Sequence, residues 1–239
     1  SIDNVSFCND CELYFLEYIP NQNKIDEYYK KKYHHYSKET YFVKNRFRRF
    51  RSVSQFQYIV SNIKDTAGKK ILEIGACDGL LLSYFKNSVV KGTEYSPVYK
   101  EIALKKYGIT LTNDNFLNID EKFDLIIMSH VIEHLPNLNE TVEKLQNLLN
   151  KNGYIFIEVP NSPKPEEKDE EYINEYLATP HIYNFTKKSL ESVFTKRKFN
   201  IISLDRFYYN LPDFVSPDDR EGISRVFLNG FGVKSKYIP

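Results

Sequence analysis

The segment "LEIGACDG" (72–79) places an acid and two glycines where an apolar run ends. Glycine tolerates positive φ angles and lets the backbone come close to a ligand, and a helix that begins near Gly79 would direct unpaired N–H groups into the same space. Such a loop suits a carboxylate or a phosphate. Glu73 can accept hydrogen bonds from the loop or from a ligand ammonium group. A tight turn without any ligand is the alternative for this segment taken alone.

Two later segments place polar side chains after further apolar runs. In "VVKGTEYSP" (89–97), Glu94 follows Gly75 by about 20 residues, a spacing at which a carboxylate can bind two ribose hydroxyls. "TNDNF" (112–116) offers an Asp or Asn for an adenine amino group and Phe116 for packing on the base.

The segment "FDLIIMSHVIEHL" (123–135) ends a fourth apolar run with ionisable side chains. Its polar residues after the run are Ser129, His130, Glu133 and His134. Ligands of open parallel sheets bind beyond the carboxyl ends of the strands. Four such ends in chain order, each with suitable polar groups, indicate a ligand site much more specifically than one glycine loop.

Together, "LEIGACDG", "GTEYSP", "FDLIIMSHVIEHL" and "NKNGYIFIEVPN" resemble the motifs of class I S-adenosylmethionine-dependent methyltransferases. The resemblance covers roughly residues 67–207 and is greatest to the group that includes bacterial sugar and small-molecule methyltransferases. It implies a Rossmann-like α/β fold with a mostly parallel, seven-stranded sheet, the last strand antiparallel, flanked by helices. A nicotinamide or flavin oxidoreductase, the competing interpretation, needs G-x-G-x-x-G after the first strand, whereas this loop reads G-A-C-D-G.

The resemblance also implies which residues bind S-adenosylmethionine. In the family the glycine loop receives the methionyl part, the acid of the second strand the ribose, and the loop after the third strand the adenine. The matching positions are Glu73, Gly75, Ala76, Cys77, Asp78, Gly79, Glu94, Tyr95, Asp114, Asn115 and Phe116. Ser129 and His130 are expected to contact the donor or its loop. Cys77 replaces the middle glycine of the usual triplet, so we expect a slightly wider loop.

Two histidines are the predicted catalytic residues. The sulfonium donor already carries the positive charge that makes it reactive, so the protein mainly supplies proximity and alignment. A hydroxyl acceptor must also lose a proton, which a histidine can take near neutral pH. His134 is the first candidate base. It lies one turn after His130, just past the fourth strand and close to where the methyl group is expected; otherwise it orients the loop. His181, after the acidic segment 160–176, is the second, since many relatives carry a histidine in a comparable segment, and a surface histidine is the alternative.

Apolar runs that alternate with helical segments are expected to position these residues. The expected strands are 71–74, 89–93, 109–111, 123–128, 154–159, 199–207 and 223–231. The expected helices are 80–86, 97–107 between Ser96 and Gly108, 138–149 with its end at Gly153, and one that Thr186 caps. Nearly continuous apolar strands predict a parallel sheet covered on both faces.

A helix is also predicted at 43–63, with one buried apolar face. That face consists of Val43, Phe47, Phe50, Val53, Phe56, Val60 and Ile63. "KNRFRRFR" (44–51) carries five positive charges and no acid. We interpret these charges as a solvated face rather than a nucleic-acid site, because the phenylalanines belong to the buried stripe. If the face binds a ligand, a phosphate or nucleotide diphosphate on the acceptor is expected.

Residues 1–42 are interpreted as an N-terminal extension, and 43–239 as one methyltransferase domain. "YHHY" (33–36) either folds over the donor as a lid or packs within the extension. "CNDCELYF" (8–15) is similar to half of a zinc ribbon, but structural zinc needs four ligands, so no metal is predicted.

Composition excludes several classes of protein. The net charge of +1 gives no general attraction to nucleic acid or anionic membranes, and three cysteines argue against a disulfide framework. No apolar run approaches the ~20 residues of a membrane span, and no signal peptide is recognised, so a cytoplasmic protein is expected.

The sequence predicts a methyltransferase for a small polar acceptor, a sugar, sugar nucleotide or surface-polysaccharide precursor methylated on a hydroxyl. Methylation of a small amine is one alternative. A non-catalytic donor-binding subunit that regulates a partner is the other. The acceptor's identity and the oligomeric state are not specified by the sequence.

Overall fold

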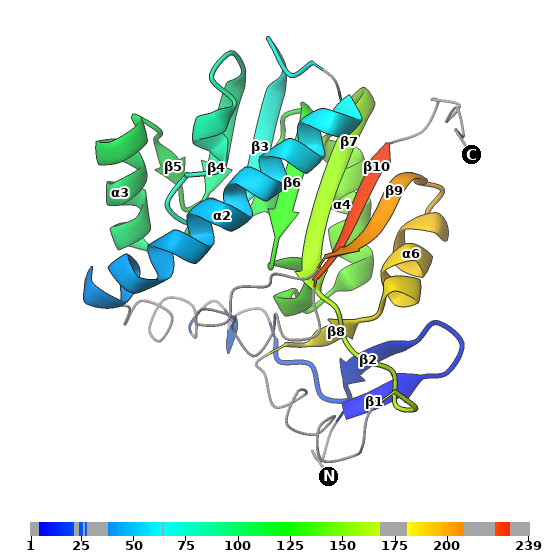
Figure 1. Cartoon of the computed structure of the whole chain (residues 1–239). Coiled ribbons are helices and arrows are strands. Elements are labelled where there is room, and N and C mark those ends of the chain that lie inside the picture. The colour runs from blue at the N-terminus through cyan, green and yellow to red at the C-terminus, as the bar shows by residue number, and fades with distance from the viewer. Residues whose placement is uncertain are drawn as a thin grey trace.

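The computed structural model describes residues 5–21, 24–25, 27, 38–63, 65–167, 181–207 and 223–229. A seven-stranded sheet, in the order β5-β4-β3-β6-β7-β10-β9, forms the centre of the molecule (Figure 1). Its strands are β3 (Lys70–Ile74), β4 (Val89–Thr93), β5 (Leu111–Thr112), β6 (Phe123–Ser129), β7 (Leu149–Pro160), β9 (Asn200–Phe207) and β10 (Ile223–Asn229). The order reverses between β3 and β6, which is where open parallel sheets bind ligands.

The strands β3 to β7 are parallel, whereas β10 is antiparallel to both of its neighbours, β7 and β9. The predicted seven-stranded methyltransferase sheet with its last strand antiparallel is therefore confirmed. The strands β3 and β6 and the second half of β7 are buried on both faces, which explains why they are almost continuously apolar, whereas β4 begins with the exposed Val89.

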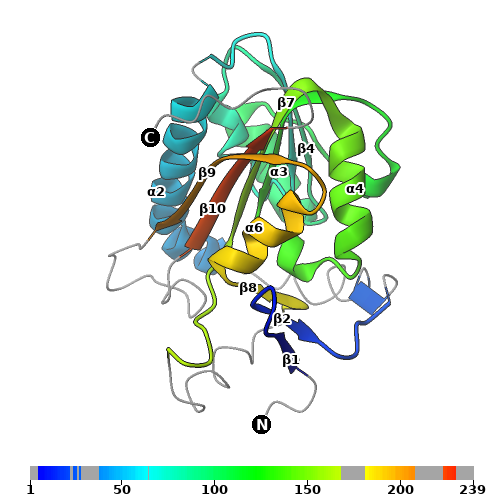
Figure 2. The same ribbon diagram turned by 90° about the vertical axis from the view of Figure 1, so that its right-hand side faces the viewer.

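Helices cover both faces of this sheet. They are α2 (Lys38–Ile63), α3 (Pro97–Tyr107), α4 (Leu138–Leu148) and α6 (Lys187–Thr195). Ile59 of α2 and Ala103 of α3 pack in one apolar core with Ile127, while Leu145 of α4 and Leu190 of α6 pack in the other. Figure 2 shows α2 and α4 on opposite sides of the sheet.

Several predicted helix ends are confirmed. The Ser96 hydroxyl accepts a hydrogen bond from the Tyr99 N–H at the start of α3, and Gly108 ends that helix with a φ of 68°. Thr186 caps α6 through a reciprocal pair of hydrogen bonds with Ser189. These ends were predictable because a cap depends on residues that are close together in the chain.

Two predicted helices are wrong in extent. Only the short 3₁₀ helix η1 (Leu82–Tyr84) follows the glycine loop, so the helix predicted at 80–86 does not form as an α-helix. The helix α4 ends at Leu148, and β7 begins at Leu149, before Gly153.

The predicted apolar face of α2 is also wrong in part. Phe50 is 51% exposed and Val53 is 39% exposed, whereas Gln55 and Ile59 are buried. The reason lies beneath the helix: part of α2 crosses the polar carboxyl ends of the strands, so its inward side chains there are polar. The helix begins at Lys38 rather than near residue 43.

A small antiparallel sheet, which the sequence analysis did not predict, lies near the carboxyl ends of the large sheet (Figure 1). It contains β1 (Val5–Cys8), β2 (Leu13–Leu16) and β8 (Tyr183–Phe185). The Leu16 N–H donates to the Ile182 carbonyl at 3.0 Å. The N-terminal hairpin therefore holds the segment that carries His181. The domain division at residue 42 stays a prediction, and "YHHY" (33–36) lies outside the described residues.

None of the helices in the described ranges has both the length and the apolar character that crossing a membrane requires.

Candidate functional site

Both glycines of the loop after β3 have the positive φ angles that the sequence predicts. Gly75 and Gly79 have φ angles of 72° and 73°, and Cys77 between them has a φ of 52°. A Cβ atom at Gly75 would lie 2.6 Å from Cγ2 of Val131, so no side chain fits there without displacing the loop after β6. The loop is a tight backbone cradle beside the point where the strand order reverses.

Glu94 lies at the end of β4, as predicted, and is buried. Its Oε2 accepts a hydrogen bond from the Cys77 N–H at 3.0 Å, and its Oε1 accepts one from the Ser96 N–H at 2.7 Å. Burial raises the pKa of Glu94, although these N–H donors and Arg48 oppose the shift. A carboxylate oxygen has two lone pairs, so each oxygen can also accept from a ribose hydroxyl.

Glu73 has an environment that suits a ligand ammonium group. It is 5% exposed, and its Oε2 has no hydrogen-bond partner among the described residues. Burial, together with the nearby charges of Asp78 and Glu94, raises the pKa of Glu73 well above its ordinary value. An ammonium group at this point would supply both the missing donors and an opposite charge. The amino-acid end of S-adenosylmethionine carries such a group, so these residues fit the cofactor.

The basic segment of α2 is a solvated face only in part: Arg49 is exposed, whereas Arg48 and Arg51 are partly buried and contact acidic side chains, contrary to the prediction. The Arg48 guanidinium donates to the Tyr99 hydroxyl at 2.7 Å and lies over the Tyr99 ring. It also lies 3.9 Å from a carboxylate oxygen of Asp78 in the glycine loop. Arg48 therefore links α2 to the donor side of the site.

The segment expected to bind adenine is only partly available for that role. Asp114 is exposed, but the Asn115 side-chain oxygen accepts from the Leu117 N–H at 3.0 Å and caps a 3₁₀ turn, η2 (Phe116–Asn118). Phe116 is buried in the apolar core that also contains Leu145 and Leu190, and Tyr95 is partly buried. Contact between these residues and adenine stays a prediction.

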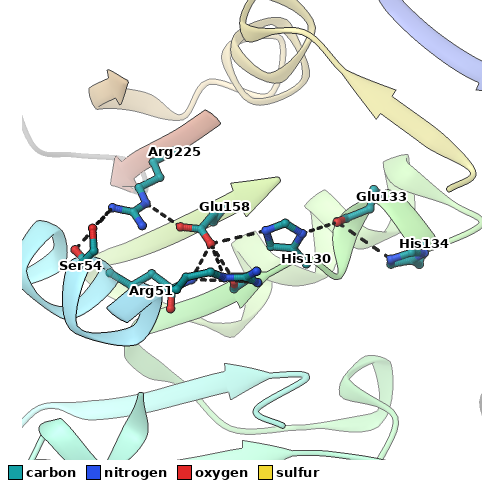
Figure 3. Close-up of polar contacts among 9 residues, drawn as sticks. Arg51, Ser54, His130, Glu133, His134, Glu158 and Arg225 are labelled. Carbon is teal, nitrogen blue, oxygen red and sulfur yellow. Dashed lines mark hydrogen bonds and ion pairs between the residues drawn. The ribbon is translucent and has the colours of Figure 1, made fainter. Parts of the chain in front are cut away.

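A buried charged centre lies at the carboxyl end of β7 (Figure 3). Glu158, with no exposed surface, pairs with Arg225 on β10, whose Nε lies 2.6 Å from Oε2. Arg51 of α2 adds a second guanidinium, with its Nε 3.0 Å from Oε1. Burial alone raises the pKa of Glu158, but Arg225, His130 and Arg51 outweigh burial and hold the pKa well below its usual range. Glu158 is therefore ionised at neutral pH.

Ser129 and His130 belong to this centre. Gln55 donates to the Ser129 hydroxyl at 2.8 Å and to Oε1 of Glu158 at 2.6 Å. His130 has a φ of 51°, and its ring lies between two buried carboxylates, 3.5 Å from Glu158 and 3.6 Å from Glu133 (Figure 3). The structure thus gives both residues a role in holding the loop, and their contact with the donor stays a prediction.

The two predicted catalytic histidines lie next to each other. His134 ends the 3₁₀ turn η3 (Ile132–His134) after β6, and its ring centroid is 4.7 Å from that of His181. His181 is 4% exposed, so the alternative of a surface histidine is excluded. Its Nδ1 lies 3.2 Å from the side-chain oxygen of Asn184. Segments almost 50 residues apart in the chain therefore form one polar group beyond the strand ends.

Sequence reasoning missed four residues of the charged centre, namely Arg51, Gln55, Glu158 and Arg225. The sequence contained a signal for two of them, Glu158 and Arg225. "YIFIEVP" and "ISRVFLN" each place one charge within an apolar strand, which is the signal that singled out Glu73.

Residues 42–204 match a protein-family model described as a methyltransferase domain. The chain belongs to this methyltransferase family. Together with the fold, the match confirms the resemblance to class I S-adenosylmethionine-dependent methyltransferases, for which S-adenosylmethionine is the methyl donor.

Curated relatives are similar to part of the methyltransferase chain. The ubiquinone biosynthesis O-methyltransferase of Glaesserella parasuis is 28% identical over 127 residues, which cover 44% of this chain and 50% of that protein. The enzyme of the same name from Pasteurella multocida is 27% identical, over 45% of this chain and 52% of that protein. The chain spans about half the length of the curated relatives it matches.

Solved structures confirm the fold. The N-methyltransferase NodS of Bradyrhizobium japonicum, in complex with S-adenosyl-L-homocysteine, aligns with a TM-score of 0.57 and 15% identity, over 78% of this chain and 88% of that one. The magnesium protoporphyrin IX methyltransferase of Synechocystis aligns with a TM-score of 0.63 and 12% identity, over 88% of this chain and 100% of that one.

Proposed function

We propose that this protein transfers the methyl group of S-adenosylmethionine to a hydroxyl of a small polar acceptor, such as a sugar, sugar nucleotide or surface-polysaccharide precursor, in the cytoplasm. The observation that carries the proposal is the histidine pair formed by His134, which is partly buried, and His181, which is buried. It lies beyond β6, the strand next to the one that ends in the glycine loop. The histidine pair, as the proton acceptor, and the glycine loop, as the binding site of the methyl donor, thus lie near the ends of neighbouring strands.

The chain's own residues have distinct parts in this reaction. The glycine loop, with Glu73 and Glu94, would hold the donor, which supplies an activated methyl group. The acceptor oxygen forms a bond with the methyl carbon as the C–S bond breaks, and the sulfur keeps the electron pair. The hydroxyl proton passes to the histidine pair, and S-adenosylhomocysteine leaves.

The curated relatives favour oxygen as the methylated atom, because both are named as O-methyltransferases. Methylation of a small amine is the second candidate, and the structural similarity to NodS, an N-methyltransferase, is the observation in its favour. Formation of S-adenosylhomocysteine that depends on an added sugar, sugar nucleotide or amine tests catalysis. Donor binding without any turnover would instead favour a regulatory subunit.

Donor affinity is expected to depend on Glu94. We expect Glu94→Ala to weaken the binding of S-adenosylmethionine at least tenfold, because hydrogen bonds to a charged group contribute about 1.5–3 kcal/mol each. Isothermal titration calorimetry measures the affinity, and the thermal midpoint checks the fold. Glu101→Ala is the matched control, since Glu101 is exposed on α3. Equal donor affinity of Glu94→Ala and wild type would remove Glu94 from the ribose site.

A further inference from the structure

Glu133 is a buried carboxylate that lacks ordinary partners. It is 1% exposed, and neither of its side-chain oxygens has a hydrogen bond among the described residues. Two ring nitrogens lie near its Oε1, Nδ1 of His130 at 3.6 Å and Nε2 of His134 at 4.0 Å, and both distances are too long for a good hydrogen bond. A buried charge without hydrogen bonds is costly, so this position calls for a compensating positive group.

The imidazole rings of His134 and His181 both lie close to the Glu133 carboxylate. Glu133, His134 and His181 each offer one ligand atom, and these three atoms lie within 4.8 Å of one another. Ligands bound to zinc at about 2.0–2.2 Å lie roughly 3–4 Å apart, so the group needs to contract by only about 1 Å. Two nitrogens and one carboxylate oxygen suit zinc, iron or cobalt rather than calcium or magnesium.

The surroundings orient this group. The side-chain oxygen of Asn184 can only accept, so Nδ1 of His181 carries the proton and Nε2 carries the lone pair. The Ile182 N–H donates to the Glu133 carbonyl at 2.9 Å, and the His134 N–H donates to the Val131 carbonyl at 3.0 Å. Backbone hydrogen bonds therefore fix both segments that supply the ligands.

We propose that Glu133, His134 and His181 bind a divalent transition-metal cation. Three protein ligands leave coordination positions open, and a hydroxyl of the acceptor can occupy one of them. With the cation bound, the two histidines are ligands and not the base: coordination lowers the pKa of that hydroxyl, its proton passes to water, and the oxygen then forms its bond with the methyl carbon as the C–S bond breaks. Proton transfer to the histidine pair, as described above, applies to the protein without the cation. The role in transfer rests on the proposed function, but cation binding itself does not.

Cobalt(II) is the probe for this site. Chelator-treated protein with Cys8→Ser and Cys11→Ser, which removes the thiols of the hairpin, is titrated with Co²⁺ by calorimetry and visible absorption. We expect one Co²⁺ per chain with a spectrum of nitrogen and oxygen ligands. Glu133→Gln and His181→Ala should each weaken binding at least about tenfold, the size of effect seen even for residues that only support a metal ligand. Glu140→Gln, at an exposed position on α4, should bind as the parent does.

Retained donor binding by each variant shows that it is folded. Absence of a stoichiometric Co²⁺ site in the parent, or equal Co²⁺ affinity in the parent, Glu133→Gln and His181→Ala, would overturn the proposal. Because the titration needs no acceptor, its result is independent of methyl transfer. A protein that binds Co²⁺ through these residues but methylates no hydroxyl would contradict the proposed function and leave the cation site standing.

Discussion

His134→Ala is expected to lower the turnover of a hydroxyl acceptor by about 10²–10⁴-fold, the usual contribution of a positioned base. Donor affinity should change little, because we assign donor binding to the glycine loop and Glu94, whereas His134 lies on η3 after β6. Steady-state kinetics give the turnover, and calorimetry gives the affinity. If His134 acts only as a cation ligand, Glu133→Gln and removal of the cation from wild type by a chelator should each lower the turnover by a similar factor.

The pH dependence separates the roles that His134 can have. An imidazole base gives a wild-type rate that rises with pH through a midpoint near 6.5. An amine acceptor must be neutral to attack, so its own alkaline pKa would govern the rate, and His134→Ala would have a modest effect. Near-normal turnover of a hydroxyl acceptor by His134→Ala would exclude His134 as the base and leave His181 as the remaining candidate.

Arg225→Met is expected to lower the free energy of unfolding by about 3–5 kcal/mol, since removing one partner of a buried ion pair leaves the other charge buried. Glu158 and Arg225 both have no exposed surface, and they lie opposite each other on β7 and β10. Urea unfolding measures the change. Arg49→Met is the control, because Arg49 is exposed on α2, and we expect a change within about 0.5 kcal/mol.

A double variant tests whether the loss comes from the unpaired charge. Glu158→Leu combined with Arg225→Met should recover part of the stability, because an apolar pair leaves no charge to compensate. A loss below about 1 kcal/mol in Arg225→Met would show that Arg51 and Gln55 suffice to stabilise Glu158.

The ion pair of Glu158 and Arg225 also predicts that the stability of the fold decreases at acidic pH. The pKa of Glu158 is lower in the folded than in the unfolded chain, so its contribution to stability is present above the unfolded value of about 4.3 and is lost as the pH falls toward the folded value. Without Arg225, burial raises that pKa. The difference between the unfolded and the folded pKa of Glu158 is then smaller, so less stability can be lost on acidification. Arg225→Met should therefore show a smaller fall in thermal midpoint from neutral to acidic pH than wild type does.

The features that the sequence predicted correctly depend on local patterns. Continuous apolar runs predicted the strands, and the positive φ angles of Gly75 and Gly79 follow from a tight turn at a strand end. The position of Glu94 at a strand end was predictable because it lies about 20 residues after the glycine loop, the spacing at which βαβ units of nucleotide-binding folds carry an acid.

The features that were missed depend on residues far apart in the chain. Periodicity placed Phe50 in a buried stripe, but it carries no information that α2 crosses the charged strand ends, where Arg51 faces Glu158 instead. The three-residue strand β8 exists because the N-terminal hairpin pairs with it, and no local signal marks such a partner. The proximity of His181 to His134 depends on the same pairing.

The most direct test of the proposed function is the position of a transferred label. The protein is incubated with S-adenosylmethionine carrying a ¹³C methyl group and with separate panels of sugars, sugar nucleotides and small amines, and the products are examined by NMR. We predict a ¹³C methyl group bonded to oxygen, formed together with S-adenosylhomocysteine, and strongly reduced in His134→Ala. A label found only on nitrogen, or donor binding with no acceptor-dependent turnover in any panel, would contradict the proposal.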